Sequence, residues 1–217
     1  MSVPYLDPAV GQYMRAHSSE PDDLLEALAA RARETPGIPA GLQISADQGR
    51  FLTMITQAAR ARTAVEVSPL TGYSTLCLAR GLSARGRLTC FADSREPATL
   101  AQPYWEQAGV AGRIVLRIGP IAERLPDLPF VPAVDVAFVN ADAADCDLFY
   151  TILLPHLASG GLMLVAGTLR DGRIARPAGR DEATRAMDEF NESVAADDRV
   201  GVIMLAVGGG LTMIRKH

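Results

Sequence analysis

The feature that most constrains the fold is a regular alternation of short apolar runs, rich in β-branched residues, with segments of helical periodicity. The runs predict strands over 63–67, 87–91, 114–118, 134–139 and 161–165. The intervening segments predict helices over 73–82, 97–109, 121–125 and 148–157. Such alternation is typical of a parallel sheet covered by helices on both faces, so we predict an α/β fold.

The segments on either side of this alternation complete the architecture. Two amphipathic helices are predicted over 24–33 and from Ser45, as a capping residue, to about 61. A helix over 182–195 precedes two strands, 201–206 and 211–215, which three glycines separate. Strands so close in sequence pair as a hairpin, so we expect a seven-stranded, mostly parallel sheet with a C-terminal antiparallel hairpin.

Length and composition favour one globular domain. The chain has 217 residues, of which 48% are hydrophobic and 21% charged. We expect the N-terminal helices, about 1–61, to pack on a core of about 62–217. The formal charge is −4 and there is no basic block, which argues against nucleic acid as a ligand.

The cysteines and the apolar runs indicate the cellular compartment of the protein. Cys77, Cys90 and Cys146 are odd in number and form no C-x-x-C pair, which favours neither a disulfide framework nor a thiolate zinc site. The first residues include acidic side chains and lack a signal-peptide core, and no apolar run reaches the ~18 residues that a membrane span needs. We therefore expect a cytoplasmic protein without a membrane segment.

The loop after the first strand is the first place to look for a ligand, because open parallel sheets bind ligands beyond the carboxyl ends of their strands. Here the chain reads V-E-V-S-P-L-T-G-Y-S-T over 65–75. It contains neither G-x-G-x-x-G nor a P-loop lysine, so no nucleotide motif is present. On its own, Gly72 is equally consistent with a plain tight turn.

The same segment resembles the corresponding loop of the cation-dependent O-methyltransferases, the family of catechol and caffeoyl-coenzyme A O-methyltransferases, typically L-E-I-G-x-x-x-G-Y-S. Further matches follow in order along nearly the whole chain, at 42–45, 104–110, 138–142, 190–191, 198–200 and 210–212. The resemblance implies a Rossmann-like S-adenosylmethionine-dependent methyltransferase fold, with S-adenosylmethionine as the cofactor.

The resemblance also implies a set of cofactor-binding residues, most of them around the methionine end of that cofactor. They are Ile44, Glu66, Ser68, Gly72, Tyr73, Ser74, Asp93 and Gly119. For Ser74, a role as a helix N-cap is the simpler alternative.

Two positions on the cofactor side depart from the family pattern. Ser68, followed by Pro69, stands where the family has glycine, and its side chain could crowd a closely bound ligand. Ala92 stands where the family has an acidic residue that accepts hydrogen bonds from the ribose hydroxyls. Asp93 is one residue later, either as a substitute acceptor or as a solvated loop residue. We therefore expect weak cofactor binding.

The metal site of the family is also changed. There, an aspartate in F-[IV]-D-A-D-K and a later Asp-Asn pair hold a divalent cation, and the lysine helps to remove the acceptor's proton. This chain has Asn140 for the aspartate, Ala143 for the lysine, and Ala166 and Gly167 for the pair. Hard cations need oxygen ligands, so we predict no metal here. Asn140 and Asp142 remain as the catalytic candidates.

Asp142, Asp145 and Asp147 allow two interpretations. They could form a displaced cation site, or they could complement the positive end of the helix that follows.

Three functions agree with these features. The first is a metal-independent O-methyltransferase that acts on a small aromatic or polyketide-like acceptor. The second is an enzyme that uses the same pocket for cyclisation, elimination or hydrolysis. The third is a catalytically inactive binding partner. The resemblance further implies a homodimer that pairs through the N-terminal helices and the back of the fold. The apolar segment 24–28 is compatible with such a contact, and also with a core helix.

Overall fold

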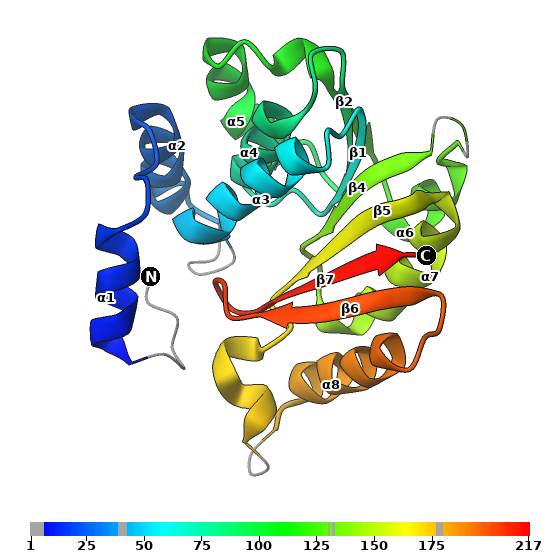
Figure 1. The fold of residues 1–217 in the computed structure, drawn as a ribbon. Coiled ribbons are helices and arrows are strands. Elements are labelled where there is room, and N and C mark those ends of the chain that lie inside the picture. Colours follow the sequence, from blue (N-terminus) through cyan, green and yellow to red (C-terminus); the bar gives the residue numbers. More distant parts are fainter. Residues whose placement is uncertain (1–6, 39–42, 130, 132, 177–179) are drawn as a thin grey trace.

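The computed structural model describes residues 7–38, 43–129, 131, 133–176 and 180–217, so that Leu42 of the matching segment 42–45 lies outside them. Its centre is a seven-stranded sheet with the order β3-β2-β1-β4-β5-β7-β6 (Figure 1). The strands are β1 Thr63–Val67, β2 Arg87–Ala92, β3 Ile114–Ile118, β4 Val134–Val139, β5 Leu157–Ala166, β6 Val200–Leu205 and β7 Leu211–Lys216. β1 to β5 run parallel, whereas β7 is antiparallel to both β5 and β6, which confirms the predicted architecture.

Helices form a layer on each face of the sheet (Figure 1). α2, α3, α4 and α5 contribute to one buried cluster, and α6, α7 and α8 contribute to the other. The helices are α1 Pro8–Ala16, α2 Asp23–Glu34, α3 Ala46–Ala58, α4 Tyr73–Gly81, α5 Glu96–Gln107, α6 Ile121–Arg124, α7 Cys146–His156 and α8 Glu182–Ala195. Short 3-10 turns lie at η1 Ala111–Arg113, η2 Leu125–Asp127, η3 Ala143–Asp145 and η4 Arg170–Ala175.

The central strand β1 shows why the apolar runs form this sheet. Val65 and Val67 belong to the cluster on the α7 side, whereas Ala64 belongs to the cluster on the α4 side. Both faces of the strand are therefore buried, as a continuous apolar run predicts for a central parallel strand.

Most predicted bounds shift by one to three residues, and two elements differ further from the sequence-based prediction. β5 begins at Leu157 rather than at 161. Its pairing with β4 has a register shift, and Gly160 and Gly161 interrupt the apolar run, so the first residues of the strand could not be recognised in the sequence. α1 was not predicted, since only Gly11 of its nine residues is buried and no apolar stripe faces the core. No helix in the described ranges is long and apolar enough to cross a bilayer.

Candidate active site

A pocket of about 410 Å³ lies at the carboxyl ends of the parallel strands. It is bounded by the loop after β1, the residue after β2, the segment after β3 and the loop after β4. The strand order reverses between β1 and β4, so this is the switch point where open α/β sheets bind ligands. The lining residues are Ser68, Leu70, Asp93, Pro120, Ile121, Ala122, Asn140, Ala141, Asp142, Asp145 and Phe149.

The loop after β1 has an unusual backbone at its first residue. Ser68 has φ +64°, in the left-handed region that glycine adopts without steric cost. Its backbone N–H donates to the carbonyl oxygen of Phe91 (2.9 Å), which ties the loop to β2. The glycine of the family pattern therefore matches a backbone requirement that this chain meets with serine.

The end of the same loop is anchored by helix α5. Trp105 is buried and donates its indole N–H to the carbonyl oxygen of Gly72 (3.1 Å). Gly72 has φ +70°, and a Cβ at this position would lie 2.8 Å from Cζ2 of Trp105 and would also collide with Ala101. The close approach of α5 thus requires a glycine here. Gly72 therefore does more than form a tight turn.

Glu66 and Ser74 lie beneath the loop and do not line the pocket. Glu66 is fully buried and accepts hydrogen bonds from the hydroxyls of Ser74 and Thr75, the latter at 2.5 Å, and from the Cys90 thiol at 3.4 Å. Burial raises the pKa of the Glu66 carboxyl, and these donors oppose the increase. Gly72, not Ser74, occupies the N-cap position of α4, so the N-cap alternative for Ser74 is wrong. The network holds the start of α4 against β1.

The ends of β2 and β3 place Asp93 at the pocket wall. Ala92 is buried, and its carbonyl oxygen accepts a hydrogen bond from the N–H of Gly119 (3.0 Å). Asp93 is exposed, and its Oδ1 accepts from the N–H of Ile121 (3.2 Å) at the start of α6. The loop thus turns the side chain toward the cavity, although strand alternation alone would place residues 92 and 93 on opposite faces.

The catalytic candidates lie on the loop after β4. Asn140 is half-buried, and its N–H donates to the carbonyl oxygen of Val67 (3.2 Å), which joins the ends of β4 and β1. Asp142 is exposed at the N-cap position of η3 and makes no side-chain capping bond. Asp145 has the same place at the start of α7, again without a side-chain cap. Both carboxylates are therefore available to the pocket that they line.

The donor set at this end of the sheet does not fit a hard divalent cation. Asn140 offers a neutral amide, Ala166 is a buried methyl group at the end of β5, and Gly167 has no side chain. Over the residues that the structure describes, no group of three His, Cys, Asp or Glu side chains has an arrangement that could hold a metal ion.

Ile44 and Tyr73 lie apart from the other predicted site residues. Both are buried and line a separate hollow of about 680 Å³ against α2. The structure thus brings Ser68, Asp93, Asn140 and Asp142 into one pocket, places Gly119 next to it, and leaves Ile44 and Tyr73 at a second one. Their roles in cofactor binding stay predictions.

Sequence reasoning missed the apolar side of the pocket. Leu70, Ile121 and Phe149 line it but belong to segments interpreted only as loop or helix. Phe149 could have been predicted to line the pocket, because it is four residues after Asp145 and therefore lies on the same helix face.

The fold and the pocket define an α/β protein with a candidate ligand pocket at the switch point of a doubly wound sheet. Comparison with known proteins specifies the family. The profile of the O-methyltransferase family matches residues 15–217, so the chain belongs to this family. It is 30% identical to catechol O-methyltransferase domain-containing protein 1 of Mus musculus over 99% of this chain and 82% of that protein. It is 34% identical to the caffeoyl-CoA O-methyltransferase of Mesembryanthemum crystallinum over 79% of this chain and 72% of that enzyme.

A solved structure agrees with this assignment. The O-methyltransferase from Bacillus cereus, determined in complex with S-adenosylhomocysteine, superposes with a TM-score of 0.84 at 27% identity, covering 96% of this chain and 97% of that one. The predicted fold, that of the S-adenosylmethionine-dependent O-methyltransferases, is confirmed.

Proposed function

We propose that this protein transfers a methyl group from S-adenosylmethionine to a hydroxyl of a small aromatic or polyketide-like acceptor, without a divalent metal. The observation that carries the proposal is the convergence of Ser68, Asp93 and Asn140 on one pocket at the switch point. Family membership and the Bacillus cereus structure, which holds the product form of the cofactor, support the choice of cofactor.

The residues present fit part of such a cofactor. One oxygen of Asp93 accepts from the Ile121 N–H, and the other has capacity for a ribose hydroxyl. The loop 68–72 would hold the methionine end, and Glu66 and Ser74 position that loop from below. When bound, this cofactor supplies an activated methyl group, so that alignment of the acceptor oxygen accounts for much of the catalysis.

The acceptor would lie on the apolar side of the pocket, against Leu70, Ile121 and Phe149. The amide of Asn140 would orient the acceptor hydroxyl by a hydrogen bond. The Asp142 carboxylate would take the hydroxyl proton as the oxygen forms its bond to the methyl carbon and the carbon–sulfur bond breaks. In this scheme Asp142 takes over the proton removal for which the family uses a lysine.

The changed donor set also supports the two alternatives, a non-methylating enzyme and an inactive binding partner. One experiment separates them. The protein is incubated with S-adenosylmethionine and a panel of catechols and hydroxylated aromatic polyketides, with and without excess chelator. We expect methylated product at equal rates in both conditions, and a large rate loss in Asp142→Asn. Cofactor binding without product would favour the alternatives, and loss of turnover with chelator would refute metal independence.

A further inference from the structure

The pocket at the carboxyl ends of the strands is negatively charged. Asp93, Asp142 and Asp145 line it, and all three are exposed. Among the described residues that line this pocket, none is a lysine, an arginine or a histidine. The lysine of the family pattern is replaced by Ala143, which is buried. The carboxylates in the pocket therefore have no positive side chain beside them in its lining.

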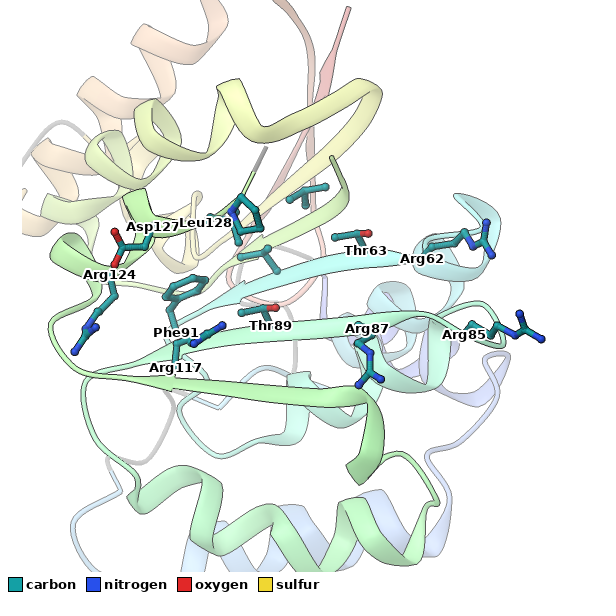
Figure 2. Close-up of a pocket in the computed structure, with 13 residues that line it drawn as sticks. Arg62, Thr63, Arg85, Arg87, Thr89, Phe91, Arg117, Arg124, Asp127 and Leu128 are labelled. Carbon is teal, nitrogen blue, oxygen red and sulfur yellow. The ribbon is translucent and has the colours of Figure 1, made fainter. Parts of the chain in front are cut away.

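Five arginines lie at a different cavity, over β1 and β2. Figure 2 shows this cavity of about 600 Å³, which is lined by Arg62, Arg85, Arg87, Arg117 and Arg124. None of the five is among the residues that line the pocket at the carboxyl ends. The two cavities are therefore lined by side chains of opposite charge.

The thiol of Cys146 lies behind the wall of the acidic pocket. Cys146 begins α7, and its thiol donates to the carbonyl oxygen of Asp142 (3.5 Å). Burial raises the pKa of this thiol to about 12, and the carboxylates of Asp145 and Asp142 add to the increase. The guanidinium of Arg170 opposes the increase, yet it forms no salt bridge with any carboxylate of the described residues. Acidic groups therefore dominate the electrostatic field at this wall.

Asp145 has no part in the proposed reaction so far. Asp93 accepts from the N–H of Ile121, and Asp142 is the proposed acceptor of the hydroxyl proton. Asp145 occupies the N-cap position of α7, but its side chain makes no capping bond. It also forms no salt bridge within the part of the chain that the structure describes. Its charge is therefore available to a cation in the pocket.

The spacing of Asp142 and Asp145 suits the two ends of one small molecule. The N–H of Asp145 donates to the carbonyl oxygen of Asp142 (3.0 Å), and residues 143–145 form the 3-10 turn η3. Three residues of such a turn rise by about 6 Å. With the reach of both side chains, this spacing suits a benzene ring with a short side chain. The hydroxyl of such a molecule can lie at Asp142 while the end of its side chain lies at Asp145.

We propose that Asp145 is a specificity-determining residue that selects an acceptor with an ammonium group, a phenol with an aminoalkyl side chain. The proposal rests on the proposed function, because the hydroxyl of that phenol is placed at Asn140 and Asp142. The positive groups of the cofactor belong to its methionine end, at the loop 68–72, and would leave Asp145 unpaired. A neutral acceptor would also leave it unpaired, and the carboxylates of the pocket would repel an anionic acceptor.

The test compares three phenols that differ at the end of the side chain: tyramine, para-ethylphenol and para-hydroxyphenylacetate. Each is titrated into protein saturated with S-adenosylhomocysteine, in excess chelator, so that a metal ion cannot bridge ligand and carboxylate. We expect tyramine to bind about fivefold more tightly than ethylphenol, and hydroxyphenylacetate to bind more weakly than ethylphenol. With S-adenosylmethionine, kcat/KM for methylation should follow the same order.

Two matched variants locate this preference. Asp145→Asn should abolish the advantage of tyramine and change the affinity for ethylphenol by less than about twofold. Asp147→Asn removes the same charge from the first turn of the same helix, but Asp147 does not line the pocket, so the preference should remain. Added salt should reduce the preference in the wild type, because salt screens an ion pair and leaves apolar packing in place.

The outcomes separate this proposal from the proposed function. Equal affinity for tyramine and ethylphenol, or a preference that Asp145→Asn leaves unchanged, would overturn the role of Asp145. A preference lost equally in Asp147→Asn would assign it to the general charge at the start of α7 and would overturn that role too. Preferential binding of tyramine without methylation of any phenol would support Asp145 and count against methyl transfer. Methylation of all three phenols with equal kcat/KM would support methyl transfer and count against Asp145.

Discussion

At the scale of single residues, the site depends on backbone geometry as much as on side-chain chemistry. Ser68 occupies a left-handed conformation at the point where the chain leaves β1 and enters the pocket wall. For a non-glycine residue, this conformation raises the free energy of the folded state by about 1–2 kcal/mol. The strain lies directly at the proposed cofactor site, so stability and binding are both expected to respond to it.

Ser68→Gly should stabilise the protein and tighten cofactor binding. Glycine removes the steric cost, although its greater freedom in the unfolded chain offsets part of the gain, which leaves a net stabilisation of about 0.5–1 kcal/mol. Thermal unfolding and calorimetry with S-adenosylhomocysteine measure the two effects. Ser83→Gly, a half-buried serine in the connection between α4 and β2, controls for added flexibility and should not improve either. A lower melting temperature in Ser68→Gly would contradict the strain argument.

The neighbouring pair Ala92 and Asp93 decides how the ribose would be held. Loss of a charge-assisted hydrogen bond costs about 1.5–3 kcal/mol, or about tenfold to a hundredfold in affinity. With Ala92 in place of an acid, we expect dissociation constants of tens of micromolar or weaker, unless Asp93 supplies the acceptor. The contact of Asp93 with Ile121 and its place on the pocket wall favour that substitution.

We therefore expect Asp93→Ala to weaken binding of S-adenosylhomocysteine by about tenfold or more. Calorimetry on the wild type, Asp93→Ala and Ala92→Asp measures this directly. If Asp93→Ala has no effect and Ala92→Asp tightens binding, the ribose site has decayed and Asp93 has no part in it. If the wild type binds no cofactor and Ala92→Asp does not restore binding, Ser68 and Pro69 are the obstruction.

At the scale of elements, α5 fixes the position of the loop after β1. The indole of Trp105 bonds to Gly72, and the helix approaches so closely that only glycine fits there. This bond could not be predicted from the sequence, because residues 72 and 105 are brought together only by the fold.

Trp105→Phe should destabilise the protein by about 1–3 kcal/mol, since it leaves the Gly72 carbonyl without its indole donor and creates a cavity. Denaturant unfolding measures the loss. Tyr104→Phe, in the same helix, removes only a long contact of 3.5 Å to the Ala27 carbonyl oxygen and should cost much less. Equal effects of the two changes would show that the bond to Gly72 contributes little.

The elements also show how much of the fold and of the site can be predicted from the sequence. β1, β3 and β4 were predicted to the residue because each is a buried apolar run with clear ends. Asp93, Asn140 and Asp142 were predicted because the resemblance to the O-methyltransferase family extends to the segments after β2 and β4, and the structure places all three at one pocket. α1 was missed because only Gly11 of its nine residues is buried.

At the scale of the whole molecule, the remaining question is how copies of the chain associate. We propose a homodimer formed through the N-terminal helices. The segment 24–28 is an unsuitable contact, because Leu28 is fully buried and Leu24 and Leu25 pack against the core. α1 offers a better one, since its Val10, Tyr13 and Met14 side chains are 48%, 64% and 44% exposed.

Solution scattering should therefore give a mass of about twice 23.1 kDa at micromolar concentration. Tyr13→Lys/Met14→Lys should reduce it to the monomer value, because two lysines from each copy would be buried against each other in the interface. Ile203→Lys, on the exposed edge strand β6, serves as the control and should leave the dimer intact. A wild-type monomer would refute the dimer, and a monomer only in Ile203→Lys would move the interface to β6.

The position of β7 between β5 and β6 has a consequence for biosynthesis. β5 and β6 are both complete by residue 205, yet their only link in the sheet is a strand made of residues 211–216. While a ribosome is still adding those residues, β5 has an unpaired edge and β6, with its apolar Val202, Ile203 and Met204, has no partner strand. The parallel half of the sheet can assemble during translation, as N-terminal segments generally do. The antiparallel half must wait until residue 216 has been added, and until then the edge of β5 stays open to pairing with another strand.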